Sequence, residues 1–211
     1  MTNSSSHFEA VIQDVDASNA DDPRRIIIDG VERPYEVVYS ERMSARLGAM
    51  YPDAGELLRI AARAQHIRRW EIPRNLYPEG RNGYNDWRKA CHENHAVLIA
   101  GIMQRHGYDA AARGRVGMLI KKEQIKKDRE SQALENVVVV VFIEHYFDEF
   151  LGKHASYDDD KLVDIVGKTL RKMSSKGHAA ALVLRLPERA KLLIGAALIH
   201  EADTLAKQAK L

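Results

Sequence analysis

Apolar positions recur along most of the chain with the three- and four-residue spacing of an amphipathic helix. The first set is Phe8, Val11, Ile12 and Val15, and the polar run NADDP follows it. From Ser40 onward the same spacing continues, interrupted at intervals by proline and glycine. This pattern predicts an all-α fold, a multi-helix bundle whose helices pack their apolar sides into one core.

Residues that cap or interrupt helices set the expected boundaries. Ser40 is expected to be an N-cap, Asn85 or Asp86 is expected to cap a long helix, and Gly107 is expected to end it. Pro187 is expected in the first turn of the last helix. After the first helix, the sequence predicts helices over residues 39–51, 54–70, 85–105, 109–125, 130–154 and 158–173, and from residue 187 onward.

Two stretches carry a β signal. Asp29-Gly30 stands between short apolar runs and favours a type I′ turn, so one short hairpin is expected near residues 26–38. The five valines at 137–141 have high strand propensity, but the flanking runs ESQALE and EHYFDEFL favour helix. We therefore expect the valine run to be helical.

The 211 residues contain no repeat, heptad array or linker, so we expect a polar, disordered tail at 1–6 and one helical domain over 7–211. The single cysteine, Cys91, excludes an internal disulfide. The first residues lack the pattern of a signal peptide, and the longest apolar run, Val137 to Ile143, is too short to cross a bilayer. A soluble, cytoplasmic protein without a membrane partner is expected.

The stretch AARAQHIRRWEIPRNLYPEGRNGYNDWRKACHENHA, residues 61–96, concentrates basic and aromatic side chains between prolines and glycines. Guanidinium groups offer paired donors that suit phosphate or carboxylate. On a helix over 54–70, the residues Arg59, Arg63, His66 and Trp70 would share one face. The predicted substrate-binding residues of this stretch are Arg63, Arg69, Arg74, Tyr77, Arg81, Trp87 and Arg88. The alternative is that these arginines are solvated or pair with nearby carboxylates.

A metal site is the second candidate chemistry. His92 and His95 are three residues apart on one predicted helix, and Glu135 falls on an otherwise apolar helix face, where an unpaired carboxylate is costly. His66, His95 and Glu135 come from three helices, as metal ligands in helical bundles do. The predicted ligands are His66, His92, His95 and Glu135. The alternative is that these histidines are buried in the core and hydrogen-bonded.

A second basic segment, KTLRKMSSKGH, supplies Lys172 and His178 as further substrate-binding candidates. The alternative is an ordinary helix C-terminus, stabilised by its cations and closed by Gly177.

Several long phrases carry a family resemblance: DVDASNADDP, VVYSERMS, residues 61–96, LIKKEQIKKDRESQALEN and GKTLRKMSSKGHAAAL. Together they resemble the bacterial and fungal family called domain of unknown function four-two-zero-two, from Phe8 to the last helix. The resemblance implies no established activity. Where the family usually has Leu-Glu-Asp, this chain has Leu134-Glu135-Asn136. The architecture is also distantly similar to HD-domain metal phosphohydrolases, although the chain has no contiguous His-Asp pair.

These features predict a metal-assisted hydrolase of a phosphate-bearing small molecule or nucleotide, with His66 and Glu135 as catalytic residues. Its cofactor would be a divalent Mn, Zn or Fe ion. One alternative is a module that binds RNA or another polyanion, with Trp70, Tyr77, Tyr84 and Trp87 stacking on bases. Another is a helical regulatory protein that forms homo-oligomers.

Overall fold

The computed structural model describes residues 3–208, with side chains over 6–202. Within this range the chain is helical apart from one two-stranded hairpin, which confirms the all-α fold class. The chain forms two compact units, Met1–Glu123 and Gln124–Leu211. The division falls inside the predicted single domain, in a lysine-rich turn that has no linker signal. Residues 1 and 2 of the predicted disordered tail lie outside the described range, and the helix begins at Asn3.

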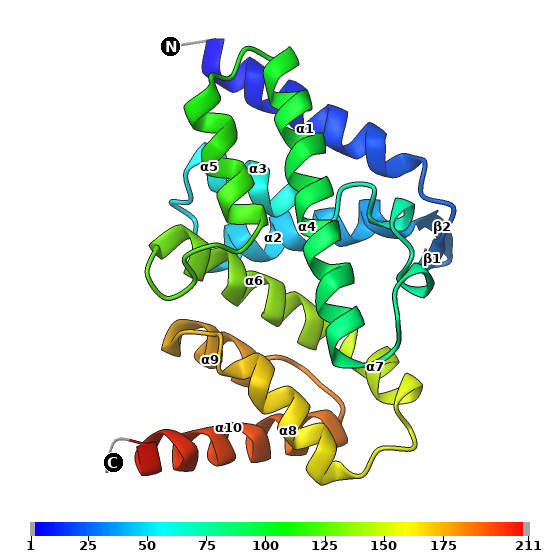
Figure 1. The fold of residues 1–211 in the computed structure, drawn as a ribbon, viewed down its shortest axis with the longest axis vertical. Helices are drawn as coiled ribbons and strands as arrows, with labels where there is room; N and C mark the ends of the chain where they lie inside the picture. The colour runs from blue at the N-terminus through cyan, green and yellow to red at the C-terminus, as the bar shows by residue number, and fades with distance from the viewer. Residues whose placement is uncertain (1–2, 209–211) are drawn as a thin grey trace. The chain divides into compact units, whose positions relative to one another are not determined.

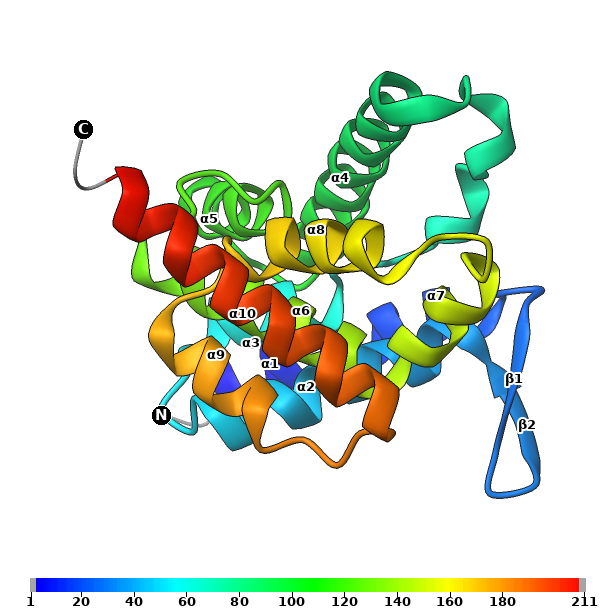
Figure 2. The same cartoon turned by 90° about the horizontal axis from the view of Figure 1, so that it is seen from below.

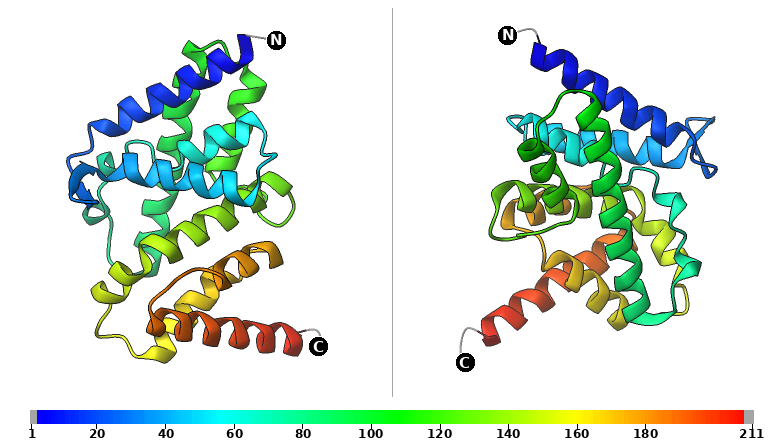
Figure 3. Two further views of the ribbon diagram at one scale, coloured as in Figure 1. Left: turned by 180° about the vertical axis from the view of Figure 1, so that it is seen from behind. Right: turned by 45° about the horizontal axis from the view of Figure 1, so that its top comes forward.

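The first unit consists of helices and the hairpin (Figure 1). Its elements are α1 (Asn3–Ala20), β1 (Arg25–Ile28), β2 (Val31–Pro34), α2 (Tyr35–Met50), α3 (Glu56–Arg63), two short 3₁₀ turns (Arg69–Glu71 and Arg74–Leu76), α4 (Gly80–Arg105) and α5 (Ala110–Ile120). Figure 3 shows α1 lying alongside α2, while α4 and α5 form an antiparallel pair.

The hairpin has the register that the Asp-Gly signal predicts. Arg25 pairs with Pro34 and Ile28 pairs with Val31, antiparallel. Asp29 and the following glycine have φ values of 50° and 79°, the two positive values of a type I′ turn. The two strands extend away from the helices of the first unit (Figure 2).

Several helix boundaries differ from the sequence prediction. The helix expected over 109–125 ends at Ile120, the one expected over 130–154 forms two helices, Arg129–His145 and Phe147–Lys153, and the one expected over 158–173 ends at Leu170. The helix expected from residue 39 begins at Tyr35, directly after Pro34, and Ser40 is buried inside it instead of capping it. The helix expected to reach Trp70 ends at Arg63. The long helix α4 begins at Gly80, five residues before the predicted cap, although it ends at Arg105 before Gly107 as expected.

The core of the first unit comes from the apolar faces of all five helices. Val11 and Val15 of the first predicted set are completely buried. Other side chains with no exposed surface are Met43, Ile60, Ile99, Met103, Val116 and Ile120. Burying a side chain of this size contributes about 1.5–3 kcal/mol. This packing holds the polar cluster described below inside the helices.

The second unit is helical throughout its described residues. It consists of α6 (Arg129–His145), α7 (Phe147–Lys153), α8 (Asp159–Leu170), α9 (Ser175–Leu182) and α10 (Glu188–Gln208). The valine run lies within α6, as predicted, because burial of nearly every side of this helix outweighs the strand propensity of valine. Helices α8 and α10 pack side by side (Figure 1), and Arg171 pairs with Glu201 at 2.6 Å.

Asn136 fastens α6 to the start of α9. Its side-chain oxygen accepts hydrogen bonds from the Ser174 backbone N–H at 2.9 Å and from Gln132 at 3.1 Å. Its side-chain nitrogen donates to the Ser174 hydroxyl at 2.8 Å. Gly177 lies against this amide as the third residue of α9, so its predicted role as a helix terminator is wrong.

A Gly177→Ala variant should therefore lose stability. Its Cβ would lie 2.6 Å from the side-chain oxygen of Asn136 and 2.9 Å from the terminal carbon of Met173. We expect the overpacking to lower the free energy of unfolding by about 1–3 kcal/mol. This loss exceeds the stabilisation that alanine gives through its higher helix propensity. Urea unfolding followed by circular dichroism measures the difference.

The matched control is Gly195→Ala in α10, where an added Cβ meets nothing within 4 Å. This variant should gain up to about 1 kcal/mol, because alanine is the better helix former. Equal effects of the two substitutions would contradict the packing described for Gly177.

Candidate functional site

The turn after α3 places His66 in the interior of the first unit. The chain leaves the helix at Ala64, and Arg68 takes a left-handed conformation with φ of 49°. The Arg68 backbone N–H donates to Asn19 at 2.9 Å, and the same asparagine donates to Ser40 at 2.9 Å. These bonds fix the turn to α1 and α2. The predicted common helix face of Arg59, Arg63, His66 and Trp70 is therefore wrong, because the helix ends before His66.

A buried carboxylate faces this turn. Glu36, in the first turn of α2, has no exposed surface. Its Oε1 accepts a hydrogen bond from Arg24 at 2.6 Å, and its backbone N–H donates to Asp22 at 3.0 Å. Its Oε2 lies 3.4 Å from Nδ1 of His66 without forming a hydrogen bond, and within the described residues this oxygen has no hydrogen-bond partner. Burial raises the pKa of Glu36, and the Arg24 guanidinium opposes that rise.

His66 lies between this carboxylate and an aromatic ring. Its imidazole stacks on Tyr39 with ring centroids 3.9 Å apart and planes at 7°. The His66 side chain keeps 22% of its surface exposed. Burial lowers the pKa of His66 well below its usual value, and the nearby positive charges of Arg69 and Lys122 lower it further. His66 is therefore neutral at physiological pH.

His95 of α4 lies next to His66, with ring centroids 6.0 Å apart, and has no exposed surface. Within the described part of the chain, neither of its ring nitrogens has a partner at hydrogen-bonding geometry, although the Gln65 backbone lies near enough to oppose in part the lowering of its pKa. Burial lowers the pKa of His95 well below its usual value, helped by His66 and Arg69. The side-chain oxygen of Gln65 is also buried and unpaired. Unpaired buried polar atoms cost about 1–3 kcal/mol each, which a purely structural core would avoid.

A layer of arginine and aromatic side chains flanks this cluster. The Arg69 guanidinium lies 4.5 Å from the centroid of Trp87, and the Trp87 indole donates to the Ile72 carbonyl at 2.8 Å. Tyr84 leans against Trp87 at 5.7 Å, and Arg88 lies over Tyr84 at 5.9 Å. Of the predicted substrate-binding residues, Arg69 is the one whose charge reaches Glu36, His66 and His95.

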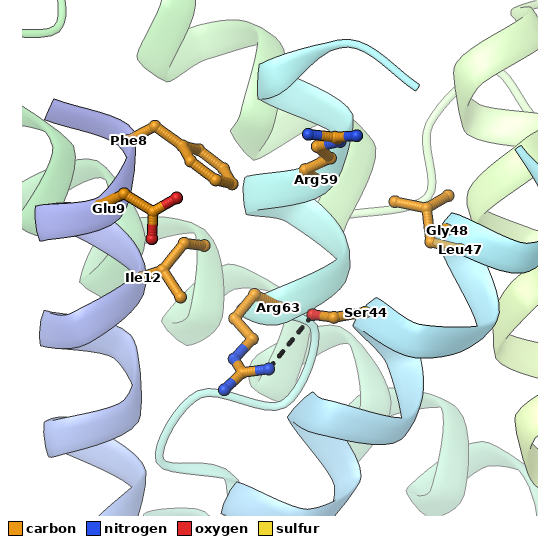
Figure 4. A pocket seen from close by; sticks show the side chains of 8 residues that line it. All are labelled: Phe8, Glu9, Ile12, Ser44, Leu47, Gly48, Arg59 and Arg63. Atoms are coloured by element: carbon orange, nitrogen blue, oxygen red, sulfur yellow. Dashed lines mark hydrogen bonds between the residues drawn. The ribbon is translucent and has the colours of Figure 1, made fainter. Parts of the chain in front are cut away.

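Other predicted residues of the first unit have different surroundings. Arg63 forms a two-pronged ion pair with Asp16, at 2.7 and 2.6 Å, and lines a separate cavity (Figure 4), so the prediction that it joins His66 in one site is wrong. Arg74 donates to the carbonyls of Tyr77 and Pro78 and closes its own loop. Arg81 is exposed.

His92 and the half-buried Tyr77 complete the set of candidates in the first unit. His92 is half-buried on α4 and contributes a positive charge to the surroundings of His66 and His95. Within residues 6–202, no three His, Cys, Asp or Glu side chains lie close enough together to hold a metal ion. The structure therefore groups no set of metal ligands among these residues, and the metal site stays a prediction.

The predicted site residues of the second unit are buried or hydrogen-bonded to neighbouring parts of the same unit. Glu135 is 3% exposed, which confirms its expected burial. His178 has its Nε2 2.8 Å from the Leu170 carbonyl, and the backbone oxygen of Lys172 accepts a hydrogen bond from Gln132. Asn136 ties α6 to α9, as described above. Roles for Glu135, Lys172 and His178 in catalysis or substrate binding stay predictions.

Sequence reasoning missed Glu36, Arg24 and Tyr39. A signal was present, because Glu36 interrupts the apolar run around Val37 and Val38 in the same way that Glu135 interrupts its own helix. The hairpin that brings Arg24 back to Glu36 was predicted, but the pairing of the two side chains depends on tertiary packing.

The model of the family Domain of unknown function (DUF4202) matches residues 9–194. The chain belongs to this family. No curated protein and no solved structure matches the chain. The DUF4202 match covers the whole of the His66 cluster and also Asn136. Among the described residues of this DUF4202 chain, no helix is long and apolar enough to cross a membrane.

The unpaired state of His95 gives a stability prediction. In the unfolded chain a histidine takes up a proton near pH 6.5, whereas folded His95 does so only at lower pH. Protons therefore favour the unfolded state, and stability falls as pH drops below about 6.5 toward the folded pKa. We expect His95→Leu to reduce this loss and to leave stability at pH 7 equal or higher by about 1–2 kcal/mol.

Urea unfolding at pH 7 and pH 5 measures both effects. Ile99→Leu is the matched control, since it alters the same buried face of α4 without removing a titrating group, and it should change stability equally at both pH values. A His95→Leu variant with the wild-type pH dependence would show that His95 is not held neutral.

Proposed function

We propose that this DUF4202 chain is an enzyme that binds a small phosphate-bearing molecule at the Glu36–His66–His95 cluster and hydrolyses it with His66 as general base. The observation that supports this most strongly is the state of His66. It is a neutral, partly exposed imidazole with a carboxylate oxygen 3.4 Å from its Nδ1 and with the positive charges of Arg69 and Lys122 nearby.

The geometry suits proton transfer. With Nδ1 facing Glu36, the basic lone pair of the neutral ring lies on Nε2. A water molecule would give its proton to Nε2 as its oxygen bonds to phosphorus. The leaving oxygen would depart with the electron pair of the broken P–O bond and take a proton from solvent. Stacking on Tyr39 limits rotation of the ring and keeps Nε2 in place.

The charges around His66 favour an anionic substrate. Arg69 and Lys122 both lower the pKa of the imidazole, so positive potential reaches the ring. A bound phosphate would offset this potential and raise the pKa of His66. Arg69 is the proposed phosphate ligand, because a guanidinium provides two parallel donors for phosphate oxygens. The proposal includes no step at a metal ion.

The arrangement of the aromatic residues favours this enzyme over a module that binds RNA. Arg69 covers one face of Trp87, Tyr84 leans on the same ring, and the indole N–H is bonded to Ile72. A stacking platform for successive bases needs open aromatic faces. The cytoplasmic location and the homo-oligomeric state predicted from the sequence stay predictions.

The test is phosphate release from a panel of nucleotides and sugar phosphates. Loss of a general base lowers turnover by about 10²–10⁴-fold, so His66→Gln should lose at least 100-fold in kcat. Arg69→Gln should mainly raise KM, because it removes a substrate contact. Arg185→Gln is the matched control, since it removes an exposed arginine that is not a candidate site residue, and it should behave as wild type.

Circular dichroism and thermal unfolding establish that each variant is folded. Turnover that survives in folded His66→Gln would contradict the proposal. Tight binding of RNA, with no phosphate release from any compound of the panel, would favour the binding module instead.

A further inference from the structure

A separate cavity of about 250 Å³ lies between three helices of the first unit (Figure 4). Phe8, Glu9 and Ile12 of α1 line one side, Leu47 of α2 lines another, and Arg59 and Arg63 project from α3 between them. Sites for drug-sized ligands span about 300–1,000 Å³, so this cavity suits a smaller molecule. It does not include His66 or any other residue of the cluster proposed for catalysis.

The charges in the cavity divide into a paired set and an unpaired set. The guanidinium of Arg63 is paired with Asp16 and donates to Ser44 at 3.4 Å. Within the described residues, the Glu9 carboxylate and the Arg59 guanidinium have no hydrogen-bond or ion-pair partner. Both side chains are exposed, so the cavity presents one solvated negative charge and one solvated positive charge beside its apolar residues.

We propose that this cavity binds a small zwitterion with an apolar side chain, of the class of the apolar α-amino acids. The ligand carboxylate pairs with Arg59 through the two parallel donors of the guanidinium. The ligand ammonium pairs with Glu9. The apolar side chain of the ligand is buried against Phe8 and Ile12, at about 25 cal/mol per Å² of apolar surface removed from water.

Neither a simple anion nor a simple cation satisfies this set of charges. A phosphate or dicarboxylate would pair with Arg59 but would be repelled by the negative charge of Glu9. An amine would pair with Glu9 but would be repelled by the positive charge of Arg59. Because exposed charges are screened by solvent and salt, each pair alone contributes little, and selectivity comes from meeting both charges and the apolar wall together.

Isothermal titration calorimetry with three matched probes tests the proposal. The probes are L-leucine, 4-methylpentanoate, which lacks the ammonium group, and 3-methylbutylamine, which lacks the carboxylate. We expect L-leucine to bind at millimolar or lower concentration and each of the other two probes to bind at least tenfold more weakly. Inorganic phosphate, added in excess, should leave L-leucine binding unchanged.

Four variants locate the site. Arg59→Gln and Glu9→Gln should each weaken L-leucine binding at least tenfold, while Arg185→Gln and Glu32→Gln, which remove exposed charges outside the cavity, should not. Amide NMR signals of Gly48 and the Ser44 region should shift with L-leucine in the wild type, which tests the location without any substitution.

Three results would overturn the proposal: no binding of L-leucine, equal binding of L-leucine and 4-methylpentanoate, or binding that both Arg59→Gln and Glu9→Gln leave intact. None of these results bears on phosphate release at His66, so this proposal and the proposed activity stand or fail separately.

Discussion

The burial of the Glu36 carboxylate is the constraint on which the first unit depends. An ionised carboxylate without exposed surface costs several kcal/mol unless it is paired and hydrogen-bonded. The hairpin β1–β2 meets part of this need, because it returns the chain so that Arg24 bonds one oxygen of the Glu36 carboxylate, while Asp22 accepts from the Glu36 backbone N–H at the start of α2. The remaining carboxylate oxygen faces His66. The fold thus places the imidazole between a buried carboxylate and the ring of Tyr39.

His66 and His95 lower the stability of the first unit, but their neutral rings suit proton transfer. Both are held neutral by burial and by nearby positive charge, and His95 has no hydrogen-bond partner among the described residues. A leucine would fill the same volume without this cost. Proteins keep such destabilising groups mainly at functional sites, where activity depends on them. Helices α1, α2 and α3 also line the separate Arg59 cavity.

Local sequence patterns predicted most of the helices and the hairpin. They failed where contacts between helices decide where an element ends. The Asp29-Gly30 turn and the helical valine run follow from turn chemistry and from flanking residues, and both are confirmed. The spacing of Arg59, Arg63 and His66 predicted one shared face, but hydrogen bonds to Asn19 stabilise a turn that ends α3 before His66. Gly177 was read as a helix end because nothing in the sequence shows that Asn136 lies against it. For the candidate site, the sequence identified His66, His95 and Arg69 by residue type. Their neighbour Glu36 could be assigned to the site only from the three-dimensional structure.

The central claim is that Glu36 orients a neutral His66 with its basic nitrogen available to substrate. The most direct measurement is the ¹⁵N NMR spectrum of the His66 imidazole at about pH 6.5, the usual pKa of a histidine. The account predicts a neutral ring with the proton on Nδ1, facing Glu36, and a bare Nε2. A doubly protonated ring, or a neutral ring with the proton on Nε2, would contradict it.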